Sequence, residues 1–307
     1  MWRTGLLIAL AAAACGRVGF DPVALVGPGD GMGPVDAPGD ASPDAAPAPA
    51  CDQSADFGTP VELTELSAST IDVTLRLEAN ELSGVFWSVR TGNAEVFRAT
   101  RPDLASAFTV AQLTDLGSTS TDLDPAVSRD GSFVVLGSSR PGGAGSSDLY
   151  EAQASGSGFL PPVLLSSIST GFAENQPNFT RGDTIMYFAS DRGGTANIYR
   201  STRTGPAAYS APELVTELVI EGQAHSDPTP SADDLTLYFA STTGAPAAND
   251  IYVTTRATTA DPFGLPKLVM SVSSPVQEGP SWLSPDGCRL YLSSTRSGVA
   301  SIFVASR

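Results

Sequence analysis

The chain has 307 residues, a length that suits one large domain or two. Its 30 glycines and 24 prolines interrupt the sequence too often for long helices, while Thr, Ser, Val, Leu and Phe are abundant. These features exclude a helical protein and favour an all-β fold. The formal net charge of −16 excludes nucleic acid as a partner, because Lys and Arg must neutralise the phosphates there.

Residues 1–14 have the pattern of a signal peptide. Arg3 precedes an apolar run from Leu6 to Ala14, which is shorter than the roughly 20 residues of a membrane-spanning helix. The end of this run, Ala12-Ala13-Ala14-Cys15, resembles the lipobox of bacterial lipoproteins. The resemblance implies that Cys15 is acylated, and Gly16 after it implies the outer membrane of a Gram-negative cell. An ordinary cleaved signal peptide followed by an incidental cysteine is the alternative.

Residues 15–50 are expected to form a lipidated cysteine and a disordered tether. The stretch from Gly27 to Ala50 is rich in Pro, Ala, Gly and Asp, contains no aromatic residue and has few side chains large enough to build a core. We therefore expect contact with the membrane through the lipid anchor only.

The rest of the chain repeats with a period of about 51 residues. Four copies share a strand that begins near a proline, a turn rich in Asp and Gly, and a second apolar strand, and their prolines are Pro125, Pro177, Pro228 and Pro280. A third strand and a fourth strand follow in each copy, and four strands per repeat predict a propeller blade. The third strands begin at Asp148, Asn197, Asp250 and Ser301.

A degenerate first copy begins at Asp72 and brings the number of inner three-strand units to five. A fourth-strand sequence at Phe57 precedes any first strand, whereas the chain ends at Arg307 directly after a third strand. The two ends therefore complete each other. We predict one five-bladed β-propeller of four-stranded blades over residues 51–307, closed by pairing the N-terminal strand with the C-terminal blade.

The last repeat also suggests a family. Ser284-Pro285-Asp286-Gly287, followed by Leu290-Tyr291-Leu292-Ser293-Ser294 and Arg296, resembles the TolB-type, WD-like propeller repeat. In that family the pattern marks a fold, and members range from partner-binding periplasmic proteins to the propeller caps of peptidases. The resemblance therefore implies a fold and no particular activity.

The cysteine and histidine content limits the chemistry. His225 is the one histidine and no G-x-S-x-G motif is present, so we reject a Ser-His-Asp site and expect His225 in a loop before Asp227 and Pro228. Too few Cys and His remain after export for a zinc site. We expect Cys51 and Cys288 to form a disulfide that clasps the ring, with two unrelated buried thiols as the alternative.

Arginines recur at the ends of the blade hairpins. We expect structural ion pairs between Arg140 and Asp148 and between Arg90 and Glu95, because the resembled family has an Arg and an Asp at these places. Trp87 and Trp282 lie in strand patterns and are expected in the core.

The candidate ligand-binding residues precede the innermost strands. Asp72, Asp122, Glu174, His225 and Gln277 occupy one repeat position, with Asp124 and Asp227 two residues beyond it. We expect Asp72, Asp122, Glu174 and His225 to ring one mouth of the central channel and to bind a cation or a basic group. A solvated acidic rim that only caps loop backbone is the alternative.

The leading function is that of a non-enzymatic cell-envelope lipoprotein, whose propeller is a scaffold for an envelope protein or glycan. No cofactor is expected, no catalytic residue is assigned, and metal binding is left open. The alternative is a five-bladed glycoside hydrolase, in which Asp72, Asp122 and Glu174 would be the paired carboxylates about 5–9.5 Å apart.

Overall fold

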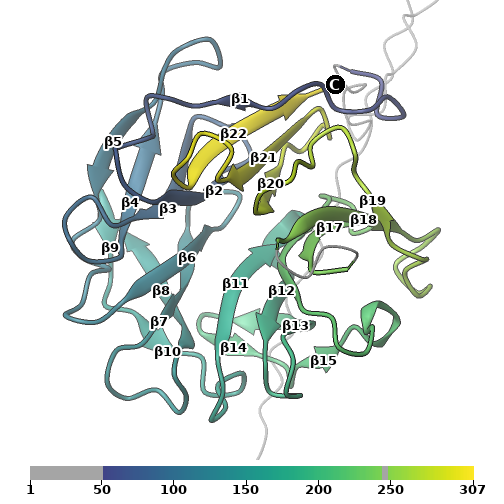
Figure 1. Cartoon of the computed structure of the whole chain (residues 1–307). Coiled ribbons are helices and arrows are strands. Elements are labelled where there is room, and N and C mark those ends of the chain that lie inside the picture. Colours follow the sequence, from purple (N-terminus) through teal and green to yellow (C-terminus); the bar gives the residue numbers. More distant parts are fainter. Residues whose placement is uncertain (1–50, 244–247) are drawn as a thin grey trace, which may run out of the picture. The chain divides into compact units, whose positions relative to one another are not determined.

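The computed structural model describes residues 51–243 and 248–307 of the chain. In this part five antiparallel sheets surround a central axis as the blades of a propeller (Figure 1). The described residues contain no α-helix, only two short 3₁₀ turns at Arg181–Asp183 and Thr216–Leu218, and no helix among them is long and apolar enough to cross a membrane. The predicted all-β propeller is confirmed, whereas Cys15 and the tether lie outside the described residues.

The blades are numbered in chain order, and the strands of each run from the axis outward. Blade 1 contains β2 (Asp72–Leu77), β3 (Ser83–Ser88), β4 (Glu95–Thr100) and β5 (Thr109–Gln112). Blade 2 contains β6 (Asp122–Val127), β7 (Phe133–Ser138), β8 (Asp148–Ser155) and β10 (Val163–Leu164), with β9 (Gly158–Phe159) also paired to β8. Blade 3 contains β11 (Glu174–Phe179), β12 (Ile185–Ser190), β13 (Asn197–Gly205) and β15 (Glu213–Leu214), with β14 (Ala208–Tyr209) also paired to β13. Blade 4 contains β16 (His225–Pro230), β17 (Thr236–Ser241), β18 (Asp250–Thr255) and β19 (Lys267–Leu268). Blade 5 contains β20 (Glu278–Leu283), β21 (Arg289–Ser294), β22 (Ser301–Ser306) and β1 (Val61–Glu62).

The ring closes through the N-terminal strand, as predicted. β1 is antiparallel to β22, with Val61 opposite Val304, so the first strand of the described chain is the outer strand of the last blade. Phe57, which precedes β1, is buried and contacts the ring of Tyr238 in blade 4 at a centroid distance of 6.1 Å. A disulfide joins Cys51 to Cys288, whose Cα atoms are 5.7 Å apart.

The hydrophobic core is divided among the gaps between neighbouring blades. Five buried clusters are found in the described residues, and each draws its side chains from two adjacent blades. Phe133 of blade 2, for example, packs edge-to-face on Phe179 of blade 3 at 5.3 Å. A single blade has too little apolar surface to stand alone, so the ring is stabilised as a whole.

The innermost strands of blades 1 to 4 carry a β-bulge at the same repeat position. Thr74, Asp124, Gln176 and Asp227 adopt positive φ angles of 65°, 48°, 57° and 51° there. Pro280 holds the equivalent place in blade 5, where the register shift lies between Pro280 and Trp282. Because the proline ring fixes φ near −65°, Pro280 cannot adopt this conformation. The alignment of all repeats on their prolines was therefore wrong by one residue in blade 5.

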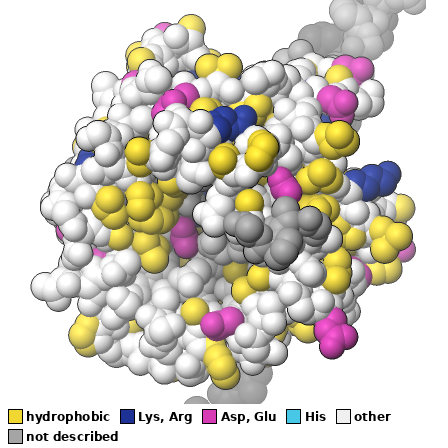
Figure 2. Space-filling view, in the orientation of Figure 1, with side chains coloured by type: hydrophobic (Ala, Val, Ile, Leu, Met, Phe, Trp, Pro, Cys, Tyr) yellow, Lys and Arg dark blue, Asp and Glu magenta, His cyan; other side chains and the backbone are white. Residues whose placement is uncertain are grey.

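One face of the propeller is seen in Figure 2. Lys and Arg side chains on this face, in the described part of the chain, are few and separated, and acidic side chains are scattered rather than gathered in one patch. The negative charge of the chain is therefore spread over this surface.

Candidate functional site

The acidic residues that we expected at the channel mouth lie inside the blades instead. Asp72, Asp122 and Glu174 are each 0% exposed. Each forms an ion pair with an arginine 18 residues later in its own blade, and the N–O distance is 2.7 Å for Asp122–Arg140 and 3.2 Å for Glu174–Arg192. The expected ring of solvent-accessible carboxylates is wrong, and these three residues are here called clamp acids.

Each clamp acid joins the start of the first strand of its blade to the end of the second strand and to the preceding loop. Asp122, for example, accepts hydrogen bonds from Ser138 Oγ at 2.6 Å and from the backbone N–H of Ser118 at 2.8 Å. Arg140 in turn donates to the backbone carbonyl of Leu116 at 2.7 Å. Removing one partner of such a buried pair leaves an uncompensated charge and destabilises the protein. The clamp acids therefore stabilise the fold and are not available to a ligand.

The expected ion pairs of Arg140 with Asp148 and of Arg90 with Glu95 are also wrong, because each arginine binds the clamp acid of its blade instead. Arg140 binds Asp122, and Arg90 binds Asp72. Both acids of each blade lie opposite the same serine at the end of the second strand, but the arginine binds the acid of the first strand and also donates to the backbone carbonyl of Leu116 in blade 2 and of Leu66 in blade 1.

Blades 4 and 5 depart from the predicted set. In blade 5 the clamp acid is Glu278, bound to Arg296 at 2.8 Å, and its neighbour Gln277 is exposed. In blade 4 His225 takes the position of the clamp acid and Thr243 that of the arginine. His225 is the first residue of β16 rather than a loop residue, packs edge-on against Phe239 at 5.4 Å, and has a pKa lowered by burial.

The residues that do reach the axis are those at the bulge. A pocket of about 190 Å³, here called the axial pocket, is lined by Thr74, Trp87, Asp124, Gln176 and Asp227 together with the start of blade 5. Four non-glycine residues with positive φ meet at this one place, and such backbone conformations cost free energy and gather at functional sites. The axial pocket is therefore the candidate binding site.

Hydrogen bonds hold the two axial carboxylates in place. Asp124 accepts from Trp87 Nε1 at 2.9 Å and from Thr74 Oγ1 at 3.3 Å, both on Oδ1. Asp227 accepts from Ser226 Oγ at 3.0 Å, and a Cβ atom at Gly279 would lie 2.9 Å from its Oδ2. Trp87 is thus a half-buried wall of the pocket and was wrongly expected in the core, whereas Trp282 is buried in it.

Arg76 is the charged residue that influences both axial carboxylates electrostatically. Its side chain is fully buried and donates through Nη1 to the carbonyl oxygens of Asp124 at 3.3 Å and Pro125 at 3.1 Å. Its Nε and Nη2 have no hydrogen-bond partner among the described residues. Burial lowers the pKa of Arg76 to about 10, against the opposing effect of Asp124 and Asp227.

The surroundings of Asp227 in the axial pocket raise the pKa of its carboxyl group to near neutral pH. Burial, reinforced by the negative charge of Asp124, raises the pKa of Asp227 to about 7. Burial also raises the pKa of Asp124, while Arg76 opposes the shift. Arg76 acts on both carboxylates only through longer-range electrostatics, so neither carboxylate has a charged hydrogen-bond partner among the described residues.

Sequence reasoning noted Asp124 and Asp227 but missed Arg76 and Trp87. The signal for Arg76 was present, since it is a charged residue at an inner-strand position where the other repeats have Ala126, Asn178, Thr229 and Trp282. In the described residues no group of three or more His, Cys, Asp and Glu side chains is arranged to hold a metal ion.

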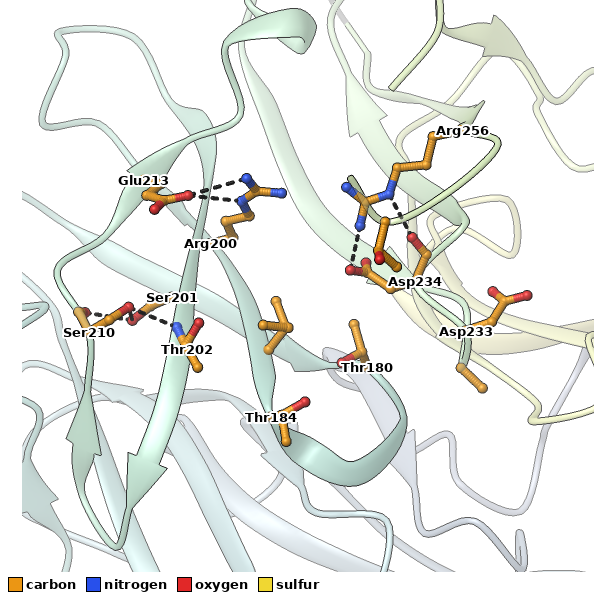
Figure 3. A pocket seen from close by; sticks show the side chains of 13 residues that line it. Thr180, Thr184, Arg200, Ser201, Thr202, Ser210, Glu213, Asp233, Asp234 and Arg256 are labelled. Carbon is orange, nitrogen blue, oxygen red and sulfur yellow. Dashed lines mark hydrogen bonds and ion pairs between the residues drawn. The ribbon is translucent and has the colours of Figure 1, made fainter. Parts of the chain in front are cut away.

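A second and larger pocket, here called the inter-blade pocket, lies between blades 3 and 4 (Figure 3). It has a volume of about 430 Å³ and is lined by Arg200 and Glu213 of blade 3 and by Asp233, Asp234 and Arg256 of blade 4, with several Thr and Ser hydroxyls. These residues lie near the turns that follow the innermost strands, whereas the axial pocket lies toward the beginning of those strands.

Comparison with known proteins supports the fold. No family model matches the chain, and no curated protein matches it. Among solved structures, TolB from Acinetobacter baumannii has a TM-score of 0.50 at 18% identity and covers 79% of this chain, while the chain spans only 56% of that protein. A thermostable family-43 glycoside hydrolase has a TM-score of 0.55 at 15% identity, covering 77% of this chain and 88% of its own. The catalytic domain of the Coprinopsis cinerea GH62 α-L-arabinofuranosidase has a TM-score of 0.52 at 11% identity, covering 83% and 98%. At these identities the likeness concerns the fold alone: the described chain is a five-bladed β-propeller, similar in fold to TolB and to glycoside hydrolases of families 43 and 62.

Proposed function

We propose that this chain is an exported envelope protein, anchored through Cys15, whose propeller is a non-enzymatic binding module. Its axial pocket holds a positively charged group, an ammonium or guanidinium, of a protein or other envelope ligand. The observation that carries the proposal is the meeting of Asp124 and Asp227 from different blades at one pocket, where neither carboxylate has an ion-pair partner among the described residues.

A cationic group would supply the counter-charge that the pair lacks. The raised pKa of Asp227 reflects the cost of ionising this half-buried carboxylate, which the charge of Asp124 increases, and a bound cation lowers that cost. Two carboxylates with a tryptophan wall suit an organic cation, which the indole face of Trp87 can also attract. The volume of about 190 Å³ admits a side-chain head group and is below the usual 300–1,000 Å³ of sites that enclose whole small molecules.

Titration of the full exported chain with arginine amide and lysine amide tests the proposal. The double variant of Asp124→Asn and Asp227→Asn should lose binding, because the ligand's charge then has no buried partner. Asp56→Asn, which removes an exposed carboxylate, is the control and should bind as the wild type does. Equal affinity of the double variant and the wild type would refute the proposal.

A glycoside hydrolase is the second candidate, and one observation favours it. A carboxyl group with a pKa of about 7, such as Asp227, is suited to donate a proton to a leaving group, and Asp124 would be the second carboxylate. Asp72, Asp122 and Glu174 cannot fill this role, because they are buried and bound to arginines or hydroxyls. Turnover of chromogenic arabinofuranosides or xylosides that is abolished by Asp227→Asn would establish the enzyme and overturn the binding module.

A further inference from the structure

The inter-blade pocket has a physical origin in the repeat. Arg200 in β13 holds the same place as Glu151 in β8, since each lies opposite the middle of the second strand of its blade, at Tyr187 and Val135. Arg256 likewise corresponds to Arg203, because each donates its backbone N–H to the hairpin turn of its own blade. The gaps between blades 2 and 3 and between blades 3 and 4 can therefore be compared position by position.

Between blades 2 and 3 the gap is closed by one carboxylate. Glu151 pairs with Arg203 at 2.8 Å and also accepts hydrogen bonds from Tyr209 Oη at 2.6 Å and from the backbone N–H of Ala207 at 2.7 Å. These partners all belong to blade 3, so Glu151 joins the two blades directly.

Between blades 3 and 4 both positions are arginine, and like charges cannot bridge the gap. Arg200 forms an ion pair with Glu213 of its own blade, with an N–O distance of 3.2 Å, and Arg256 forms an ion pair with Asp234 of its own blade. Figure 3 shows the two ion pairs on opposite sides of the open space. The pocket of about 430 Å³ lies where the bridging carboxylate of the neighbouring gap is replaced by Arg200, and the hydrogen bond from Tyr187 Oη to Asp234 joins blades 3 and 4 instead.

The blade 4 wall of the pocket is rigid. Asp234 accepts a hydrogen bond from Tyr187 Oη at 2.9 Å in addition to its pairing with Arg256. The Arg256 side chain is only 1% exposed, and its guanidinium lies 4.4 Å from the centre of the Phe263 ring. A wall that is already ordered loses little conformational entropy when a ligand binds.

The charges that surround the pocket select a neutral ligand. An anion would meet the carboxylates of Glu213, Asp233 and Asp234, and a cation would meet the accessible guanidinium group of Arg200 and the positive charge of the buried Arg256. A hydroxyl group can accept from an arginine and donate to a carboxylate, and it also pairs with the exposed hydroxyls of Thr184 and Thr202 that line the pocket. We propose that the inter-blade pocket binds a neutral saccharide through its hydroxyl groups.

The volume and the lining define the expected mode of binding. About 430 Å³ lies within the range of small-molecule sites. No aromatic ring of the described residues lines the pocket, so binding rests on hydrogen bonds to the two ion pairs and the hydroxyls. We therefore expect affinities in the millimolar range for a short saccharide.

Saturation-transfer NMR and calorimetry on the full exported chain test the site with maltose and cellobiose, and with glucuronate and glucosamine as charged counterparts. Arg200→Met removes a guanidinium from one wall and should weaken disaccharide binding by about tenfold, the loss expected for a hydrogen bond to a charged group. Arg98→Met is the matched control, because Arg98 occupies the equivalent place in β4 and is outside the pocket.

The expected result is binding of at least one neutral disaccharide, weakened in Arg200→Met and unchanged in Arg98→Met, with both variants melting cooperatively. The site is independent of the axial pocket, so Asp227→Asn should leave disaccharide binding unchanged. The proposal is overturned if neither disaccharide binds the wild type, if both arginine variants lose binding equally, or if a charged sugar binds more tightly than its neutral counterpart.

Discussion

Replacing Asp227 by Asn should make the protein more stable at pH 8 relative to the wild type than it is at pH 5. The pKa of Asp227 is raised to about 7 in the folded protein by burial and by Asp124, whereas an unfolded Asp titrates near 3.9. Between these values the folded state binds more protons than the unfolded state. The stability that this group contributes is therefore full below pH 4 and is lost as the pH rises through 7.

The magnitude follows from the two pKa values. Between pH 5 and pH 8 the wild type should lose about 2–3 kcal/mol through Asp227, since a tenfold difference in proton affinity between the folded and unfolded states is worth about 1.4 kcal/mol. Asn has nearly the same shape and no charge, so the variant lacks this contribution. The difference in stability between variant and wild type should therefore increase by about 2–3 kcal/mol, or by roughly 5–10 °C in Tm for a domain of this size.

Urea unfolding of both proteins at pH 5 and pH 8, followed by tryptophan fluorescence, measures the effect. Asp56→Asn is the control for the loss of an exposed acid and should show no such pH dependence. If Asp227→Asn changes stability equally at the two pH values, then Asp227 has an ordinary pKa and the electrostatic description of the axial pocket is wrong.

Three further predictions concern the disulfide, the buried ion pair of a clamp acid and the lipid anchor. Changing Cys51 and Cys288 to Ser should lower the free energy of unfolding by roughly 2–4 kcal/mol in denaturant titrations without reductant, and an unchanged midpoint would contradict a stabilising clasp. Arg140→Met leaves Asp122 charged and buried and should cost about 3–5 kcal/mol by the same assay; a loss below about 1 kcal/mol would mean that the pair behaves as an exposed one. Cys15→Ser should release the exported protein from the membrane fraction, and firm retention of the variant after fractionation would disprove the lipid anchor.

The blade number and the ring closure could be predicted from the sequence because they depend on spacing. The repeat of about 51 residues and the fourth-strand pattern at Phe57 required only that hydrophobic strands recur and that the ends be complementary. The β1–β22 pairing follows from that count alone.

The candidate site was harder because a bulge changes which face of a strand each side chain occupies. Asp122 and Asp124 are two residues apart in one strand, yet the first is sealed in a clamp and the second lines the axial pocket. The proline of blade 5 stands one repeat position earlier than in blades 2 to 4, two residues after Glu278 instead of three after the clamp position, so a proline-based alignment selected Gln277 instead of Glu278. Neither effect can be derived from the alternation of apolar and polar residues.

The central claim is that Asp124 and Asp227 form a charge-deficient pair that a cationic group completes. Its most direct test is the carboxyl-carbon NMR titration of Asp227 in the full chain labelled at aspartate, with and without saturating arginine amide and with Asp227→Asn to assign the signal. We predict an apparent pKa near 7 in the free protein and a clear decrease when the ligand binds, because the cation stabilises the ionised form. An apparent pKa near 4 that does not respond to the ligand would contradict the claim.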